Sequence, residues 1–300
     1  MQTEQSLPNP TRSGAVRNIA WWKNRKVRDL IWRSAIFIFI CLLGILFIFP
    51  LAWMISTSLK SNEQVYVIPT VWIPNPIVWE NYPNALARMP FIRFLINSCI
   101  TSFIPIVGAI LSASLVAYAF SRVRWPGRDI WFIILISTMM LPGQVTMIPL
   151  YVLYSRLGWI NTYLPLIVPW FFGGAFYIFL LRQFYSSIPM ELTNAAFIDG
   201  CSHLGIWWRI MLPLSRPALA TVGIFTFLFT WNDFIGPLLY LKTESMYTLQ
   251  IGLQYFRDQY SVAWQELMAA SAVVLSPTLL IFFLGQKLFV EGITLTGIKG

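Results

Sequence analysis

Charged residues are scarce in this sequence. Asp, Glu, Lys and Arg make up 11% of its 300 residues, whereas a typical soluble protein carries about 25%. Apolar residues make up 57%, and 23 Phe, 14 Trp and 12 Tyr add to the apolar surface. One core of a 34.5-kDa globule cannot bury so much of it, so part must face lipid. The composition therefore predicts an integral membrane protein and excludes a soluble enzyme, a disordered chain and a disulfide scaffold.

Histidine and cysteine are scarce as well. The chain has one histidine, His203, and three cysteines that we expect to lie in different compartments or membrane depths. No set of Cys, His and acidic residues has the spacing of metal ligands, and no Gly-x-x-x-x-Gly-Lys-Ser/Thr phosphate loop occurs. We therefore expect no metal site, no bound cofactor and no ATP hydrolysis in this chain. A membrane enzyme would also need clustered catalytic groups, which the sequence does not show.

Long apolar runs are the dominant feature that is present. A helix needs about 20 apolar residues to cross a bilayer, and six runs meet this length, at residues 31–55, 94–120, 130–153, 164–181, 218–241 and 267–290. They are too long and unbroken for the alternating strands of a membrane barrel. The sequence predicts an all-α polytopic membrane protein with six transmembrane helices in residues 31–290, an N-terminal tail at 1–30 and a C-terminal tail at 291–300.

The basic residues are unevenly distributed between the two sides of the predicted helices. Fifteen of the 21 Lys and Arg residues fall in the tails and in alternate loops on the same side, and six fall on the other side. The positive-inside rule then places both termini in the cytoplasm. The net charge of +9 is therefore a topological signal, and we expect no nucleic-acid partner. A role of residues 21–28 in binding a nucleic acid or an anionic lipid surface is the alternative.

The loop at residues 183–216 is the longest of those predicted on the cytoplasmic side. Pro189 suits the first turn of a helix, Glu191 complements the positive end of the helix dipole, and Gly200 is expected to end the helix. Three residues at i, i+3 and i+4 share one face of this helix, where small side chains permit close approach: Leu192, Ala195 and Ala196. The loop is either an interfacial hairpin or a docking element for another protein.

Polar and helix-breaking residues lie inside the predicted spans. Asp233, beside Asn232, would cost about 2.5–3.5 kcal/mol at the bilayer centre, so we expect it to face the bundle interior. It is either a structural cap or pair, or part of a translocation pathway. Pro142-Gly143 is the strongest predicted break, which makes a cavity-forming bundle plausible. Tryptophans near the ends of the runs, Trp170 among them, are expected to form interfacial belts rather than a sugar-stacking platform.

The loop carries a motif that resembles a known family. Asn194-Ala195-Ala196 and Gly200, followed after nine residues by Ile210-x-Leu212-Pro213, resemble the Glu-Ala-Ala loop of permease subunits in bacterial ABC importers. Asn194 replaces the glutamate of the family name, while Glu191 stands where sugar-type members carry another acid. On this resemblance, the residues expected to couple the chain to an ATPase are Glu191, Leu192, Ala195, Ala196, Asp199 and Gly200.

The resemblance extends from about residue 31 to residue 300 and is strongest to relatives of the smaller maltose-transporter permease. Leu141-Pro142 and Trp231-Asn232-Asp233-Phe234 are among the stretches that carry it. It implies a type I ABC importer permease fold in a bacterial or archaeal cytoplasmic membrane, half of a heterodimeric pore for an oligosaccharide. The implied partners are a second homologous permease, two ATPase subunits that hold ATP and magnesium, and an extracytoplasmic sugar-binding protein. Asn232 and Asp233 are then expected in the translocation pathway.

A self-contained secondary carrier is the alternative function. Such a carrier would show internal repeats and several ionisable residues within its spans. The sequence shows no convincing repeat, and Asp233 is the one intramembrane acid that we identify. The ABC permease hypothesis is therefore favoured.

Overall fold

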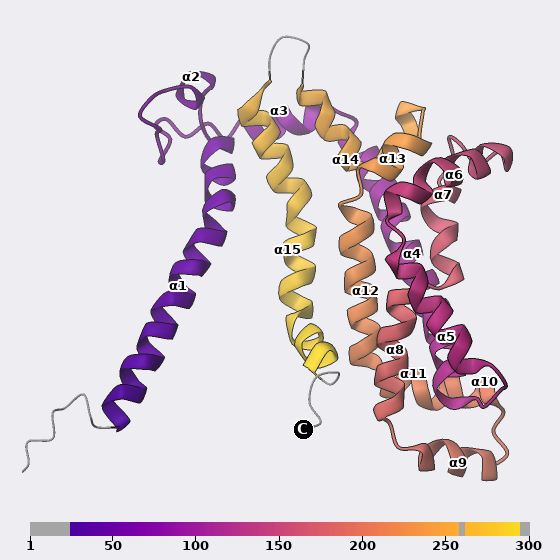
Figure 1. The fold of residues 1–300 in the computed structure, drawn as a ribbon. Coiled ribbons are helices and arrows are strands. Elements are labelled where there is room, and N and C mark those ends of the chain that lie inside the picture. Colours follow the sequence, from indigo (N-terminus) through magenta and orange to yellow (C-terminus); the bar gives the residue numbers. More distant parts are fainter. Residues whose placement is uncertain (1–24, 258–261, 295–300) are drawn as a thin grey trace, which may run out of the picture. The chain divides into compact units, whose positions relative to one another are not determined.

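The computed structural model describes residues 25–257 and 262–294. Most of the tails predicted at 1–30 and 291–300 lie outside these residues. The described chain is built of helices joined by turns (Figure 1). It divides into a first unit, residues 1–53, and a second unit, residues 54–300, which are described separately below.

The first unit consists of most of helix α1 (Arg25–Ser58). Its sequence is apolar on every face from Ala35 to Phe49, which is typical of a helix that crosses a bilayer. The predicted first span is therefore confirmed as one long helix. Pro50 lies within it without ending it.

The core of the second unit is formed by three helices. They are α4 (Phe91–Arg122), α8 (Ala175–Ser187) and α12 (Arg216–Trp231), and α4 contacts both of the others. Three α4 residues spaced four apart on one helix face, Ala109, Ala113 and Ala117, are fully buried. Small side chains at a helix interface let two backbones approach closely, which is the usual way in which membrane helices pack. A fourth long helix, α15 (Trp264–Thr294), packs against α12.

The third predicted span is broken where the sequence indicated. Helix α5 (Arg128–Ser137) continues as a short 3₁₀ turn to Met140, and α6 (Gly143–Arg156) then leaves at an angle of 97°. Pro142 lies between them in an extended conformation. The helix is interrupted here because a proline has no amide hydrogen to continue the hydrogen-bond pattern. The fourth span is also interrupted. It consists of α7 (Leu164–Ile167), a 3₁₀ turn at Val168–Phe172 and α8.

The fifth predicted span is wrong in its extent. A continuous helix was expected over residues 218–241, but α12 ends at Trp231 and a separate helix, α13 (Ile235–Tyr240), follows. The reason is local, because the Asp233 carboxylate accepts a hydrogen bond from the Gly236 amide at 3.0 Å and so caps α13. At its other end α12 meets the helical segment His203–Leu214 at 81°.

Four described helices are long and apolar enough to cross a membrane, and up to six segments are if each bent pair is one span. The all-α polytopic fold is therefore confirmed. The remaining elements are short: α2 (Asn62–Val65), α3 (Asn81–Ala87), α9 (Met190–Ile198), α10 (His203–Ile206), a π-helical turn (Trp207–Met211), α11 (Leu212–Leu214), α14 (Leu249–Gly252) and two 3₁₀ turns (Glu244–Met246 and Leu253–Phe256).

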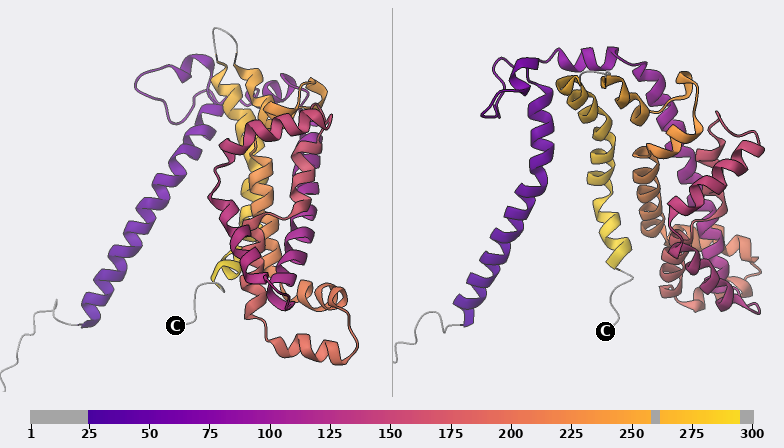
Figure 2. Two further views of the ribbon diagram at one scale, coloured as in Figure 1. Left: turned by 45° about the vertical axis from the view of Figure 1, so that its right-hand side comes forward. Right: turned by 45° about the horizontal axis from the view of Figure 1, so that its top comes forward.

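The short helices of the second unit gather at its two ends. Figures 1 and 2 show α3, α6, α13 and α14 at one end, and α9, α10 and α11 at the other. We call these the α13 end and the α9 end. The long helices α4, α8 and α12 run between them, so one bundle carries two separate sets of loops.

Candidate functional site

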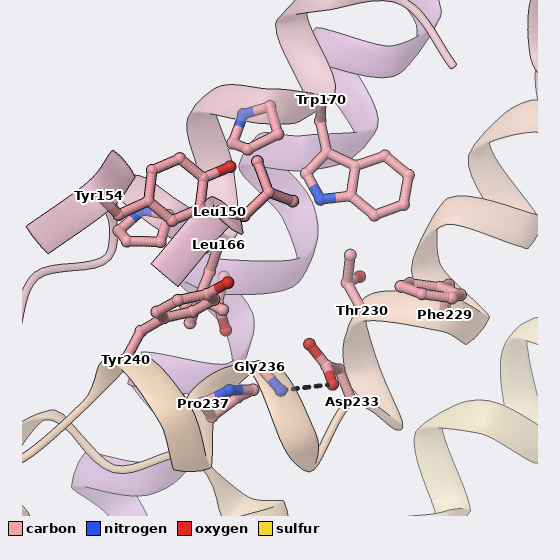
Figure 3. Close-up of a pocket in the computed structure, with 13 residues that line it drawn as sticks. Leu150, Tyr154, Leu166, Trp170, Phe229, Thr230, Asp233, Gly236, Pro237 and Tyr240 are labelled. Carbon is pink, nitrogen blue, oxygen red and sulfur yellow. Dashed lines mark hydrogen bonds between the residues drawn. The ribbon is translucent and has the colours of Figure 1, made fainter. Parts of the chain in front are cut away.

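A cavity of about 230 Å³ lies in the second unit toward the α13 end. Residues from α4, α6, α7, the following 3₁₀ turn, α12 and α13 line it, and Figure 3 shows most of them. They are Thr101, Leu150, Tyr154, Pro165, Leu166, Pro169, Trp170, Phe229, Thr230, Asp233, Gly236, Pro237 and Tyr240. Most of its wall comes from segments where the predicted spans are interrupted. This arrangement is typical of membrane proteins, in which irregular backbone is tolerated where it lines a cavity.

Aromatic side chains form much of the cavity wall. Trp170 packs edge-on against Phe229 with ring centroids 5.6 Å apart and stacks with Tyr177 at 6.3 Å. Across the cavity, Tyr154 meets Tyr240 edge-on at 5.4 Å. The 3₁₀ turn Val168–Phe172 thus places Trp170 in the cavity wall, and its membership of an interfacial belt stays a prediction.

Asp233 supplies the carboxylate of the cavity. Its side chain is half-buried, and Figure 3 shows it directed toward the enclosed space beside Thr230 and Tyr240. It faces the interior of the unit, as expected from the cost of placing it in lipid. One carboxylate oxygen caps α13 through Gly236, so the cap and the cavity contact coexist in one residue.

Asn232 points elsewhere. Its side chain is exposed, and its amide donates a hydrogen bond to the Leu228 carbonyl at 2.8 Å. It does not line the cavity. Of the two residues predicted in the translocation pathway, the structure therefore brings Asp233 alone to the cavity.

The loop next to this cavity is fixed by Asn161. Its carboxamide oxygen accepts hydrogen bonds from the amides of Lys242 and Thr243 at 3.0 and 2.9 Å, and its nitrogen donates to the Thr243 hydroxyl at 2.8 Å. Its φ of 61° lies in the left-handed region, which asparagine tolerates better than most residues. Asn161 thus ties the turn after α6 to the turn after α13, whose helices both contribute to the cavity.

Sequence reasoning did not identify Tyr154, Thr230 or Tyr240 as cavity residues. The available signal was the set of prolines inside the apolar runs, because Pro165, Pro169 and Pro237 all lie in the cavity wall. Hydropathy alone could not show which side chains beside these breaks point inward.

The second candidate site is helix α9 at the α9 end. It begins after Pro189, carries Glu191 in its first turn, and ends at Asp199. Gly200 follows with a φ of 78°, and its amide donates to the Phe197 carbonyl at 3.0 Å. A glycine in the left-handed conformation is the usual helix terminator, so the predicted start and end of this helix are confirmed.

The two faces of α9 differ from the expected arrangement. Ala196 is 5% exposed and packs in the same cluster as Ile206 and Met211, and Thr193 is also buried. We expected Ala196 to share an open face with Leu192 and Ala195, but the chain's own helices cover it. The exposed residues of this helix include Glu191, Leu192, Ala195, Ile198 and Asp199, together with Asn194 and Phe197. Ile198, which is 87% exposed, was not predicted.

Few side chains attach α9 to the bundle. The guanidinium of Arg122, at the end of α4, donates hydrogen bonds to the Tyr185 and Ile188 carbonyls, the latter at 2.6 Å, and contacts the Met190 sulfur at 3.2 Å. On the other side, Phe197 packs edge-on against His203 at 4.8 Å. The same imidazole is 3.1 Å from the Tyr118 hydroxyl. The sole histidine therefore has a packing role between α4, α9 and α10.

Within the described ranges, no group of three or more His, Cys, Asp and Glu side chains is placed to hold a metal ion. The cavity offers aromatic surfaces and the Asp233 carboxylate, and α9 offers an exposed apolar face flanked by the carboxylates of Glu191 and Asp199. These groups can bind and guide a solute or a partner protein.

Comparison with known proteins places the chain in one family. The family described as "Binding-protein-dependent transport system inner membrane component" matches residues 106–294, which include all of α9 and almost all of the cavity wall. The probable ABC transporter permease protein YurM of Bacillus subtilis (strain 168) is 32% identical over 275 residues, 90% of each chain. The arabinooligosaccharides transport system permease protein AraQ of the same organism is 32% identical over 273 residues, 90% of this chain and 97% of AraQ.

The fold is shared with a solved transporter. A chain in the crystal structure of a bacterial ABC transporter involved in the import of the acidic polysaccharide alginate superimposes with a TM-score of 0.76 at 24% identity. The match covers 87% of this chain and 97% of that chain. The predicted ABC importer permease fold is thus confirmed. Because both the family match and the relatives extend over most of its length, the chain belongs to the family of binding-protein-dependent transport system inner membrane components.

Proposed function

We propose that this chain is one permease subunit of an ATP-driven oligosaccharide importer in a bacterial or archaeal cytoplasmic membrane. The observation that carries the sugar class is the 32% identity to AraQ, a permease protein of an arabinooligosaccharide system, over 90% of this chain. The uneven distribution of Lys and Arg supports an orientation with both termini in the cytoplasm. In this orientation the α9 end is cytoplasmic and the α13 end faces outward.

The cavity is the part of this chain that we propose to lie along the translocation pathway. Sites for small solutes combine aromatic and apolar walls with a few placed polar groups. Trp170, Tyr154 and Tyr240 supply the walls, while Asp233 and Thr230 supply a hydrogen-bond acceptor and a hydroxyl. This set suits a sugar, which has apolar ring faces and hydroxyl edges. A second homologous permease would complete the pore, and an extracytoplasmic sugar-binding protein would deliver the solute.

In this proposal the energy comes from partner subunits, because the sequence has no phosphate-binding loop of its own. We propose that two ATPase subunits, which hold ATP and magnesium, dock on the α9 end of the permease pair. The docking face of this chain is Leu192, Ala195, Ile198 and Asp199, with Glu191 at its edge. An exposed Ile198 beside Leu192, which is 45% exposed, is typical of a surface that a partner covers.

The test is reconstitution of the complete importer. The chain is co-expressed with the second permease, ATPase and binding protein encoded with it, and uptake of a panel of labelled oligosaccharides into proteoliposomes is measured with and without ATP. We expect uptake that requires both ATP and the binding protein. ATP-independent uptake by this chain alone would instead establish a secondary carrier.

A variant sharpens the docking claim. Ala195→Leu adds three heavy atoms to the open face of α9, so we expect it to reduce co-purification of the ATPase. Ala87→Leu is the matched control, because Ala87 is an exposed alanine in the helix α3 at the opposite end. Full ATPase recovery with Ala195→Leu would overturn the assignment of this face.

A further inference from the structure

Two adjoining hollows lie at the start of α5, away from the cavity. The first is lined by Arg124, Trp125, Gly127, Arg128, Asp129 and Ile130, with a volume of about 420 Å³. The second is lined by Phe120, Trp125, Trp131, Ile134, Leu135 and Thr138, with a volume of about 530 Å³. They share Trp125. A hollow lined by charged and apolar residues thus lies beside a mainly apolar one, with Trp125 in the wall of both.

A tight turn shapes the polar hollow. Residues 125–128 have the sequence Trp-Pro-Gly-Arg, and Gly127 adopts φ 81° and ψ 0°. These angles at the third residue, with proline at the second, define a type II turn, and the Arg128 amide donates to the Trp125 carbonyl at 3.4 Å. The turn holds Arg124 and Arg128 in the wall of one hollow.

The apolar hollow is built on packed aromatic rings. Phe120 contacts Trp125 and Phe132 with ring centroids 5.7 and 5.4 Å apart. Trp131 and Ile134 stand on the open side and are 58% and 49% exposed. The apolar hollow is therefore a groove whose inner wall consists of packed aromatic rings and whose outer side is exposed along α5.

The charge around the polar hollow is positive. Asp129 accepts a hydrogen bond from Arg128 at 3.0 Å and lies 3.9 Å from Arg182, whose guanidinium stacks over Phe132 at 3.9 Å. Asp129 thus lies close to two arginines, and Arg124 adds a third positive charge in the wall of the same hollow. The Arg124 side chain is exposed, and its guanidinium makes no hydrogen bond or ion pair within the part of the chain that the structure describes. An anionic ligand is therefore favoured at this position.

We propose that these two hollows form a binding site for an anionic phospholipid. The phosphate lies between Arg124 and Arg128, where charge-assisted hydrogen bonds are available, and one acyl chain lies along the groove beside Trp131 and Ile134. Basic pockets at the cytoplasmic ends of membrane helices bind anionic headgroups in this way, and tryptophan suits the interface between headgroup and chain. The inference depends on the proposed function in one respect, the assignment of the α9 end to the cytoplasmic side of the membrane, because the two hollows lie at that end.

The test uses the full-length chain purified in mild detergent. Native mass spectrometry measures lipid retention after addition of phosphatidylglycerol and phosphatidylcholine with identical acyl chains at equal concentration. We expect preferential retention of phosphatidylglycerol. Arg124→Gln with Arg128→Gln should lower it by about fivefold per arginine, whereas Arg156→Gln, an exposed arginine in the last turn of α6, should not change it.

Three outcomes would overturn the proposal. One is equal retention of the two lipids by the wild-type chain, a comparison that needs no variant to fold. Another is unchanged retention by the double variant. The third is a cross-link from Trp131→Cys to a partner subunit in the assembled importer together with loss of the lipid, which would show that a protein covers the groove. Failure of sugar uptake leaves the lipid measurement unaffected, so the two proposals fail separately.

Discussion

The two ends of the second unit hold their loops in different ways. At the α13 end, polar side chains reach across long stretches of sequence, as when Asn97 donates to the Ser245 and Tyr247 carbonyls at 3.0 and 2.8 Å. Arg88 forms an ion pair with Glu266 at 2.9 Å, and Asn161 joins two turns. At the α9 end, α9 depends on Arg122 and on the burial of Thr193 and Ala196, and its other side exposes apolar residues.

This difference indicates that the two ends have different functions. Side-chain hydrogen bonds to backbone carbonyls fix the loops around the cavity without help from another protein. The α9 end leaves Ile198 and Leu192 in the open, which is costly unless a partner covers them. Loops that are tied together within the chain at one end, and an open α9 face at the other, fit a permease that receives solute between fixed loops and energy through a docked subunit.

The largest expected effect comes from removing Arg122. Its side chain is 7% exposed and satisfies the Tyr185 and Ile188 carbonyls at the corner between α8 and α9. Hydrogen bonds to a charged group contribute about 1.5–3 kcal/mol each, so Arg122→Ala should lower the free energy of unfolding by about 3 kcal/mol. Thermal unfolding in detergent measures it. Arg122→Lys keeps one donor and should lose less; equal stability of all three proteins would contradict the role of Arg122.

A smaller effect is expected from bulk on the inner side of α9. Ala196→Leu overpacks the contact with Ile206 and Met211, which costs about 1–3 kcal/mol, and should loosen α9 from the bundle. Ala195→Leu, one residue earlier on the open side, should leave the unfolding temperature unchanged while reducing ATPase recovery. Limited proteolysis within residues 186–203 reports the loosening directly. Equal protease sensitivity of the two variants would show that the faces of α9 are wrongly assigned.

The smallest effect is expected at Asn161. Asn161→Gly tolerates the left-handed backbone but removes the hydrogen bonds to Lys242 and Thr243, which water can replace in part. We expect a loss of about 1 kcal/mol and faster amide exchange at Lys242 and Thr243. Hydrogen–deuterium exchange measures this. Unchanged protection of these amides would mean that Asn161 does not fix the turn.

Much of this architecture could be predicted from the sequence because it depends on local properties. The apolar runs predicted the long helices. Pro142 predicted the break that the structure shows as an angle of 97°, and Gly200 predicted the end of α9. The predicted extent of the fifth span was wrong because residues 235–240 are as apolar as α12. Hydropathy does not detect the hydrogen bond by which Asp233 accepts from the amide of Gly236 and caps α13.

The sites were harder to predict because they depend on tertiary packing. Helical spacing groups Leu192, Ala195 and Ala196 on one side of α9, but the arc that the bundle covers is set by Ile206 and Met211, which come later in the chain. Likewise, Trp170 near the end of an apolar run is typical of an interfacial belt, and the 3₁₀ turn that directs it into the cavity wall is visible only in the folded chain.

Site-specific cross-linking of α9 in the assembled importer tests the central claim most directly. With Cys41, Cys99 and Cys201 replaced by serine, single cysteines at Ala195, Ile198 and the buried Thr193 are treated with a short bifunctional reagent, and products with the ATPase are quantified. We predict cross-links from positions 195 and 198 but not from 193, with yields that change when ATP binds. Absence of any ATPase product from 195 and 198, in an importer that still transports sugar, would contradict α9 as the docking helix.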